Sequence, residues 1–349
     1  MVTERIVAAQ SEGPVEEAVT LSLRPQKLSD YVGQPKLIEK LTIALDAARQ
    51  RGPEAGAMDH VLLHGPPGLG KTTLANIIAL EMGANLVTTS GPALTRPTDL
   101  VGTLTRLGEG DVLFIDEIHR LPPIVEEYIY PAMEDYKIDF TLDQGMHAKA
   151  ITLPIKPFTL IGATTRAGLL SGPMRSRFGI VHSLEFYNNN DLHKILTRSA
   201  ELLEMRTDTD ERADAGLRTI AERSRGTPRI ANRLLRRVRD YAQVRAQGRL
   251  TPDAVDKALR LESVDELGLD ELDRKYLKVI GTIYEGGPVG LEAIAATLSE
   301  DAATLEELVE PYLLQIGFLA RTRRGRTLTQ RAASHIGVEL PLKDDALFD

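Results

Sequence analysis

Short apolar runs alternate with amphipathic helical patterns along the first half of the chain. Apolar residues recur at helical spacing, for example Ile38, Leu41 and Leu45, in residues 35–51, 74–82 and 125–136. The apolar runs predict strands at residues 61–63, 85–89, 111–115, 158–165 and 181–186. Strands that alternate with helices favour a parallel sheet with helices on both faces. We therefore expect an α/β core domain in residues 1–187, with a loose arm at about 1–19.

The second half of the chain has a different pattern. Helical periodicity without strands predicts a helical lid domain at residues 188–258, with helices at 192–205, 213–224, 230–245 and 252–261. Residues 259–349 combine helical patterns at 272–284, 291–298 and 304–315 with a predicted hairpin whose arms are 318–321 and 326–328. Helices followed by a short β-wing are typical of a winged helix. The predicted fold is thus an α/β parallel-sheet core, a helical lid and a C-terminal winged-helix domain.

Residues 137–153 interrupt the alternation of strands and helices. Apolar and polar residues alternate at 138–142, a turn follows at 143–145, and a second extended run covers 148–153, which together predict a β-hairpin. This hairpin is an addition to a minimal nucleotide-binding core. It could cover a sheet edge, or it could present apolar side chains to a partner, and the sequence leaves both interpretations open.

Composition narrows the class of protein without changing this picture. The 349 residues are 42% hydrophobic and 26% charged, which is typical of a globular protein, and they include no cysteine. Disulfides and thiolate metal sites are therefore excluded. The sequence shows no secretory signal and no apolar run long enough to span a bilayer. The net charge of −8 argues against a protein that coats nucleic acid with its whole surface, although local basic patches remain.

The strongest chemical signal is a glycine-rich loop between a predicted strand and a predicted helix: Gly65-Pro66-Pro67-Gly68-Leu69-Gly70-Lys71-Thr72-Thr73. Glycines let successive backbone N–H groups turn inward around a phosphate, and the helix N-terminus adds partial positive charge. Lys71 can reach the terminal phosphates of a nucleotide, and the Thr72 hydroxyl can bind Mg²⁺. The full motif in strand–loop–helix context predicts a nucleotide site.

Two further strand ends carry polar residues. Asp116 and Glu117 follow the buried strand at 111–115, where open α/β sheets bind ligands. Asp116 suits a direct or indirect role toward Mg²⁺, and Glu117 suits polarisation of the attacking water. The strand at 158–165 ends with a threonine pair whose second member, Thr165, could contact the γ-phosphate or that water.

Basic residues gather in two places. Arg229, Arg233, Arg236 and Arg237 recur at helical spacing, either as a solvated basic face or with Arg229 directed to the nucleotide. On the predicted wing the basic residues are Arg321, Arg323, Arg324, Arg326 and Arg331. Such a cluster on an acidic chain is expected for contact with a phosphate backbone, although winged helices also dock on proteins.

Taken together, these motifs resemble the RuvB family of AAA+ ATPases, bacterial motors that drive branch migration of Holliday junctions. The resemblance covers nearly the whole chain, and the phosphate loop alone would indicate only the superfamily. The other segments that carry it are Leu23-Arg24-Pro25, Tyr31-Val32-Gly33-Gln34, Leu113-Phe114-Ile115-Asp116-Glu117-Ile118-His119-Arg120, Tyr130-Pro131-Ala132-Met133-Glu134-Asp135-Tyr136, Ile161-Gly162-Ala163-Thr164-Thr165-Arg166, Gly226-Thr227-Pro228-Arg229-Ile230-Ala231-Asn232-Arg233-Leu234-Leu235-Arg236-Arg237 and Gly286-Gly287-Pro288-Val289-Gly290-Leu291.

The resemblance implies a set of ATP-binding residues. The adenine would be bordered by Leu23, Arg24, Tyr31 and Val32. The phosphates and Mg²⁺ would be held by Gly65, Gly68, Gly70, Lys71, Thr72 and Thr73, with Asp116 as a further Mg²⁺ residue. Four residues from farther along the chain would also line the site: Glu134, Asp135, Tyr136 and Tyr187.

It also implies catalytic and DNA-binding roles. Thr165 stands where many relatives carry a polar asparagine sensor, and Arg177 matches an arginine finger that acts in the neighbouring subunit's site, with Arg175 as the alternative. Arg229 would be the sensor arginine of the lid. Arg321 and Arg326 would contact DNA, whereas a third basic position of the family falls on Ala302 here.

The function implied by the resemblance is an ATP-driven DNA motor of recombination, repair and the SOS response. It would work in the cytoplasm as a homo-hexameric ring on duplex DNA at Holliday junctions, without sequence preference. RuvA would dock on hairpin 137–153, and RuvC would join the resolving complex. Two other classes stay open at this point: an initiator or clamp-loader-like ATP switch, and an AAA+ machine that remodels proteins.

Overall fold

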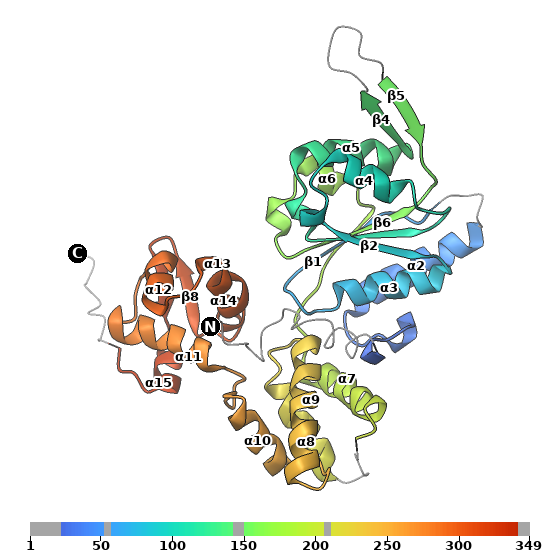
Figure 1. Cartoon of the computed structure of the whole chain (residues 1–349). Helices are drawn as coiled ribbons and strands as arrows, with labels where there is room; N and C mark the ends of the chain where they lie inside the picture. Colours follow the sequence, from blue (N-terminus) through green and yellow to red (C-terminus); the bar gives the residue numbers. More distant parts are fainter. Residues whose placement is uncertain (1–21, 52–56, 142–149, 206–210, 341–349) are drawn as a thin grey trace. The chain divides into compact units, whose positions relative to one another are not determined.

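The computed structural model describes residues 22–51, 57–141, 150–205 and 211–340. It divides into two compact units, one ending at Tyr187 and the next starting at Asn188. The predicted arm at 1–19 and the predicted turn at 143–145 lie outside the described residues. Figure 1 shows the elements of both units, which are described separately below.

A five-stranded parallel sheet forms the centre of the first unit, in the order β2-β3-β6-β1-β7. The strands are β1 (Val61–His64), β2 (Leu86–Ser90), β3 (Val112–Asp116), β6 (Thr159–Thr164) and β7 (Ile180–Ser183). Each was expected from an apolar run, although β7 ends earlier than predicted. Because the strands are parallel, their carboxyl ends meet at one edge of the sheet.

Helices cover both faces of this sheet, as predicted. Figure 1 shows α2 (Pro35–Arg51) and α3 (Lys71–Met82) on one side, and α4 (Pro97–Leu104) and α5 (Pro123–Glu134) on the other. The core on the α4–α5 side joins Leu62, Leu113 and Leu160 of the strands to helix residues such as Leu100 and Ile129, all fully buried. Shorter helical segments are η1 (Leu28–Asp30), η3 (Gly91–Ala93), η4 (Ile118–Arg120), η5 (Ala167–Leu169) and α6 (Gly172–Ser176).

The predicted hairpin is present and forms a sheet of its own. Strand β4 (Lys137–Thr141) pairs antiparallel with β5 (Ala150–Pro154), with Ile138 opposite Leu153. In Figure 1 the hairpin extends away from the five-stranded sheet. It therefore does not extend that sheet, and Ile138 at its base is buried in the core.

The second unit begins with the lid helices α7 (Asn189–Leu202), α8 (Glu211–Glu222), α9 (Pro228–Arg245) and α10 (Pro252–Leu261). Their apolar faces pack on one another, with Leu192, Leu234 and Val255 fully buried. We call these four helices the lid. The periodicity of the sequence predicted each of them to within a few residues at the described ends.

The head follows, defined here as α11 to α15 with β8 and β9. Its elements are α11 (Glu271–Lys278), η6 (Val279–Ile283), α12 (Leu291–Leu298), α13 (Ala302–Thr304), η7 (Leu305–Val309), α14 (Glu310–Gln315), β8 (Leu319–Thr322), β9 (Gly325–Leu328) and α15 (Gln330–Ile336). The β8–β9 hairpin is the predicted wing. The predicted helix at 304–315 is not one α-helix, because a π-helical turn, η7, precedes Pro311, whose ring nitrogen has no hydrogen to donate.

Candidate functional site: a nucleotide pocket and a basic wing

The loop between β1 and α3 has the backbone that phosphate binding requires. Gly65, Gly68 and Gly70 have φ values of 137°, 80° and 103°, in the region that only glycine adopts readily. A Cβ on Gly65 would lie 2.6 Å from the Leu184 carbonyl oxygen. Because Lys71 begins a 12-residue helix directly after the loop, the positive end of the helix dipole lies at the loop.

Lys71 places its charge inside this loop. Its side chain is 8% exposed, and its Nζ donates hydrogen bonds to the carbonyl oxygens of Gly65 at 2.8 Å and Pro66 at 2.9 Å. The ammonium is thus held close to the turning backbone by the carbonyl groups of the loop. A buried, oriented positive charge at this point suits a polyphosphate.

Two tyrosines from distant parts of the chain close over the loop. The Tyr187 hydroxyl donates to that of Tyr31 at 2.8 Å, and the Tyr31 hydroxyl lies 3.3 Å from the Leu69 carbonyl oxygen that accepts from it. A Cβ on Gly70 would lie 2.7 Å from the same Tyr31 oxygen. Burial, with the neighbouring Tyr187, raises the pKa of Tyr31 well above its ordinary value. The structure therefore brings both predicted tyrosines to the phosphate loop.

The acidic pair at the end of β3 is held by its neighbours. The backbone N–H of Glu117 donates to Asp116 Oδ1 at 2.9 Å, and Glu117 has a left-handed backbone with φ 49° and ψ 43°. Its Oε2 accepts from the Thr165 hydroxyl at 3.4 Å and lies 3.4 Å from Nδ1 of His119. Residues predicted at the ends of β3 and β6 thus meet around one carboxylate.

His119 is a member of this group that sequence reasoning did not single out. Its side chain is 7% exposed, and its Nδ1 shares a 2.8 Å hydrogen bond with Thr164 Oγ1. The Thr164 oxygen also accepts from the backbone N–H of Arg166 at 3.0 Å. A histidine three residues after the strand aspartate was the available signal. His119, which follows β3, reaches Thr164 of β6 because these two strands are neighbours in the sheet.

Arg177 is paired on the same subunit with a residue predicted to line the nucleotide site. Its Nη2 lies 3.2 and 3.3 Å from the two carboxylate oxygens of Glu134. Its Nη1 donates to the Pro173 carbonyl oxygen at 2.8 Å, and the guanidinium lies 4.1 Å from the centre of the Tyr130 ring. By contrast, Arg175 donates to the Ala167 carbonyl oxygen at 2.5 Å.

The rest of the predicted Glu134–Tyr136 segment divides between two environments. Asp135 pairs with Lys137 at 2.9 Å on the surface. The Tyr136 ring packs edge-on against Phe158, with 6.1 Å between ring centres, and burial raises its pKa. Nearby, burial and a hydrogen bond to Glu126 raise the pKa of Tyr130, whose ring lies beneath Arg177.

The wing arginines Arg321 and Arg326 are not free cations. Arg321 and Arg326 lie opposite each other on β8 and β9, and both bind the carboxylate of Glu310, whose side chain is fully buried. Arg326 Nε donates to Glu310 Oε1 at 2.8 Å, and Arg321 Nη2 lies 3.2 Å from Glu306 Oε1. The Tyr276 hydroxyl donates to the same Glu310 oxygen at 2.5 Å. Two carboxylates therefore balance the two arginines, which the sequence pattern did not reveal.

The pKa values of this cluster follow from its contacts. Burial alone would raise the pKa of the Glu310 carboxyl, but the hydrogen bonds from Arg326, Tyr276 and Arg321 hold it below its ordinary value. The hydrogen bond to Glu310 raises the pKa of Arg326, and burial with that carboxylate raises the pKa of Tyr276. The arrangement is thus built for charged arginines and an ionised glutamate.

Three models of known protein domains match the chain. The model of the Holliday junction DNA helicase RuvB P-loop domain matches residues 23–184, that of the RuvB AAA lid domain matches 187–265, and that of the RuvB C-terminal winged helix domain matches 266–337. The chain belongs to the RuvB family.

Solved structures agree with these matches. The Thermotoga maritima RuvB Holliday junction branch migration motor is 52% identical, with a TM-score of 0.81, and the match covers 92% of this chain and 100% of that one. A mutant of the Thermotoga maritima protein is 51% identical, with a TM-score of 0.83, covering 91% of this chain and 99% of that one. This RuvB-family chain is therefore an AAA+ P-loop ATPase with a lid and a winged-helix head, and its function is that of a branch migration motor. The predicted domain boundaries after residues 187 and 258 stay predictions.

The structure separates the arginines of α9 by their burial. Arg229 is the second residue of this helix, next to Pro228, and is half-buried. Arg233 is only 1% exposed, so the four arginines do not form one solvated face.

Within residues 22–51, 57–141, 150–205 and 211–340, no helix is long and apolar enough to cross a bilayer, and no three or more His, Asp or Glu side chains cluster as a metal site.

Proposed function

We propose that ATP binds the phosphate loop with Mg²⁺ and is hydrolysed with residues contributed by two subunits. The single observation that carries this proposal is the loop itself, which combines three left-handed glycines, a buried Lys71 and a helix N-terminus. No other element of the described chain combines these features. The adenine would lie beside Leu23, Arg24, Tyr31 and Val32, of which Leu23 is buried and the others are half-buried.

Mg²⁺ would be held by Thr72 and, directly or through water, by Asp116. Magnesium in such sites takes one or two protein ligands and the phosphates of the substrate, so it needs no cluster of protein carboxylates. The Thr72 position in the first turn of α3, with the half-buried Asp116 at the end of β3, fits this requirement. When bound, Mg²⁺ would neutralise charge that develops on the phosphates.

Glu117 would polarise the attacking water. Its carboxylate is positioned by the Thr165 hydroxyl and His119, so it has a defined direction at the carboxyl edge of the sheet. Thr165 would serve as the polar sensor that contacts the γ-phosphate or this water. Such a general base contributes about 10²- to 10⁴-fold to the rate.

Arg177 would act in the site of the neighbouring subunit. Its planar guanidinium stabilises the charge of a transferring phosphoryl group when it is placed against it. In this chain Arg177 packs on Tyr130 and is paired with Glu134, and their side chains are 21% and 54% exposed. Repetition of this contact from one subunit to the next would close a ring, which we propose is a homo-hexamer.

The lid and head would convert hydrolysis into movement of DNA. Arg229 would sense the nucleotide from the lid, and Arg321 and Arg326 would contact the phosphates of duplex DNA at a Holliday junction. Phosphate contacts carry no base information, so binding would be independent of sequence. Ala302 cannot supply the third basic contact expected for the family.

Partner proteins complete the proposal. The β4–β5 hairpin, predicted at 137–153, would receive RuvA, because its described strands stand apart from the core sheet. RuvC would join the complex that resolves the junction. A motor on bacterial DNA would work in the cytoplasm, which suits a chain without cysteine.

ATP hydrolysis by the purified chain, measured with and without four-way junction DNA, tests the proposal. Junction DNA should stimulate hydrolysis, and Lys71→Ala should abolish it because the phosphates lose their buried cation. Lys40→Ala, an exposed lysine of α2, serves as the matched control and should leave hydrolysis unchanged. Full hydrolysis by the Lys71→Ala variant would refute the assignment of the site.

A further inference from the structure

A strained turn lies between the lid helices α8 and α9. Arg225 has a left-handed backbone with φ 54°, and Gly226 follows with φ 66°. A non-glycine residue adopts this conformation at a cost, and such strain persists only where surrounding contacts enforce it. The Thr227 hydroxyl donates to the Arg225 carbonyl oxygen at 3.2 Å, and α9 starts immediately afterwards with Pro228 and Arg229. The proposed nucleotide sensor is therefore four residues from this turn.

The Arg225 side chain extends from the turn to the head. Its Nε donates to the Gly268 carbonyl oxygen at 2.7 Å, and its Nη2 forms an ion pair with Asp273 of α11. The guanidinium also lies 5.0 Å from the centre of the Tyr312 ring of α14. The Arg225 side chain is 3% exposed and that of Asp273 is 0% exposed. One arginine of the lid thus contacts three separate segments that belong to or lead into the head.

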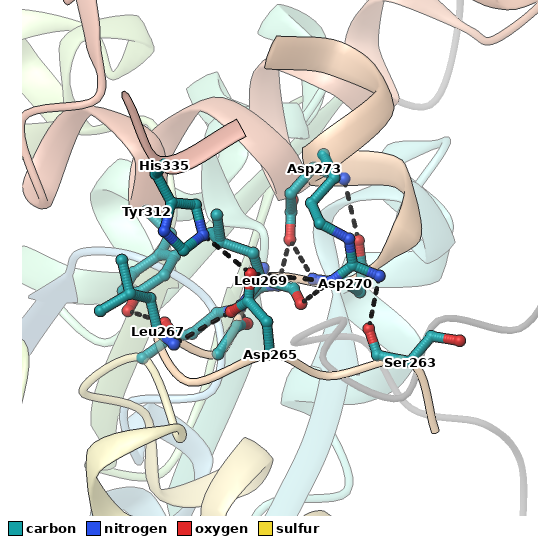
Figure 2. A network of polar contacts seen from close by, with 11 residues as sticks. Ser263, Asp265, Leu267, Leu269, Asp270, Asp273, Tyr312 and His335 are labelled. Carbon is teal, nitrogen blue, oxygen red and sulfur yellow. Dashed lines mark hydrogen bonds and ion pairs between the residues drawn. The ribbon is translucent and has the colours of Figure 1, made fainter. Parts of the chain in front are cut away.

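The segment that receives Arg225 is itself firmly attached to the head. We call residues 262–270, between α10 and α11, the linker. The Tyr312 hydroxyl donates to the Leu267 carbonyl oxygen at 2.6 Å, and His335 Nε2 lies 3.0 Å from Asp265 Oδ2. Figure 2 shows these residues gathered around the linker, with Leu269 between them. Leu269 is fully buried in the hydrophobic core of the head, so the second half of the linker is attached to the head. Its first residues, 262–264, instead hydrogen-bond to α10 of the lid.

Two features make this contact specific. Gly268 has φ 76°, and a Cβ there would lie 2.4 Å from the Arg223 carbonyl oxygen, so the linker can approach the lid turn this closely only as glycine. Asp273 also accepts from the backbone N–H of Asp270 at 2.9 Å at the start of α11. The charge that holds Arg225 is therefore fixed to the first turn of a head helix, and loss of the arginine would remove a buried, charged hydrogen-bond partner from it.

We propose that Arg225 is a positioning residue that couples the lid to the head. A displacement of the turn before α9 would be passed through Arg225 to α11 and the linker, and so to the wing that carries Arg321 and Arg326. This inference rests on the proposed roles of Arg229 and the wing. It adds the connection between them, which the phosphate loop and the wing do not by themselves provide.

Two variants and a matched control test the coupling in the full-length chain. Arg225→Met removes the ion pair while keeping an unbranched side chain, and Gly268→Ala separates the linker from the lid turn without removing a charge. Arg223→Met is the control, because Arg223 pairs within the lid, with Asp256 of α10 at 2.5 Å. All three should hydrolyse ATP without DNA at close to the wild-type rate and should bind duplex DNA.

The decisive quantity is the rate of four-way junction migration divided by the rate of ATP hydrolysis. We expect Arg225→Met and Gly268→Ala to lower this ratio at least tenfold and Arg223→Met to leave it within twofold. An unchanged ratio in Arg225→Met would overturn the inference. If Arg225→Met fails to fold, an unchanged ratio in Gly268→Ala does the same.

A second measurement does not depend on activity. Because the chain has no cysteine, Val244→Cys in α9 and Ala296→Cys in α12, both exposed, provide one spin label in the lid and one in the head. The distance distribution between the labels should be narrow in an otherwise unchanged chain and should broaden when Arg225→Met is added. Equal widths would refute the coupling even if hydrolysis and DNA binding behave as proposed, whereas loss of hydrolysis with the expected broadening would count only against the proposed function.

Discussion

At the scale of single residues, the proposed nucleotide site includes side chains outside the phosphate-loop motif. Glu117 has the carboxylate proposed to polarise water, yet its direction is set by the Thr165 hydroxyl at 3.4 Å and by His119. His119 is fixed in turn by Thr164. The orientation of the Glu117 carboxylate thus depends on residues at the ends of two strands, β3 and β6, and in the turn that follows β3.

Replacement of Thr165 tests this arrangement. Thr165→Val keeps the shape of the side chain but removes the hydroxyl, so kcat for ATP hydrolysis should fall by roughly 10- to 100-fold, within the range for general-base catalysis. Nucleotide affinity, measured by titration calorimetry, should change little, because the phosphate loop is intact. Thr165→Ser keeps the hydroxyl and should retain most activity. A Thr165→Val enzyme with wild-type kcat would exclude Thr165 from positioning the catalytic carboxylate.

At the scale of elements, the glycines at the two ends of α3 differ in their surroundings. Gly70 before the helix and Gly83 after it both have a left-handed backbone, with φ 103° and 65°. A Cβ on Gly70 would lie 2.7 Å from the Tyr31 hydroxyl, whereas a Cβ on Gly83 would meet no atom within 4 Å. The two positions therefore share a backbone requirement but differ in crowding.

Alanine at each position separates these effects. Gly83→Ala should lower the free energy of unfolding by about 1 kcal/mol and leave ATP binding unchanged, since only backbone strain is added. Gly70→Ala should weaken ATP binding at least tenfold, because the loop or the Tyr31–Tyr187 pair must move. Binding of a fluorescent ATP analogue measures both. Similar affinities for the two variants would show that crowding at Tyr31 does not shape the site.

The wing and η7 also act as one element. Arg321 and Arg326 are balanced by Glu310 and Glu306, so the arginines proposed to contact DNA add no net charge while both carboxylates are ionised. Glu310 is fully buried and contacts both arginines, whereas Glu306 is 38% exposed and would repel a DNA phosphate that approached them.

Neutralising Glu306 should therefore strengthen DNA binding. We expect Glu306→Gln to raise the affinity for duplex DNA roughly two- to fivefold at low salt, which corresponds to the free energy of a partly exposed ion pair. The dependence of this affinity on salt concentration should become steeper. Glu307→Gln makes the same change of net charge at the neighbouring exposed position and should have a smaller effect. Fluorescence anisotropy over a salt series measures both variants. Equal effects would indicate that only net charge matters.

The sequence predicted those elements whose signals are local. The phosphate loop, the buried strand that ends at Asp116 and the β8–β9 wing were all recognisable because each is a continuous pattern of glycines, apolar residues or turn residues. The partners of Arg321 were not, because Glu306 and Glu310 look like ordinary residues of an amphipathic helix. Their role appears only when η7 and α14 pack beneath the wing. His119 and the burial of Arg233 were missed for the same reason.

At the scale of the whole molecule, we propose that subunits complete each other's sites. Arg177 contacts Glu134 and Tyr130. The phosphate loop of the same chain contains Lys71 as its buried cation. If Arg177 acts on the neighbour, each catalytic site needs one subunit with Lys71 and another with Arg177. The Lys71 and Arg177 of one catalytic site then come from two different chains. A self-sufficient ATPase would need both residues in one chain.

Mixing two inactive variants tests this claim most directly. Arg177→Ala and Lys71→Ala should each abolish ATP hydrolysis, the first while ATP still binds. When they are mixed with junction DNA, some interfaces should combine an intact phosphate loop with an intact Arg177, and hydrolysis should recover in proportion to those interfaces. No recovery at any ratio, in mixtures shown by native mass spectrometry to contain both variants in one assembly, would contradict the central claim.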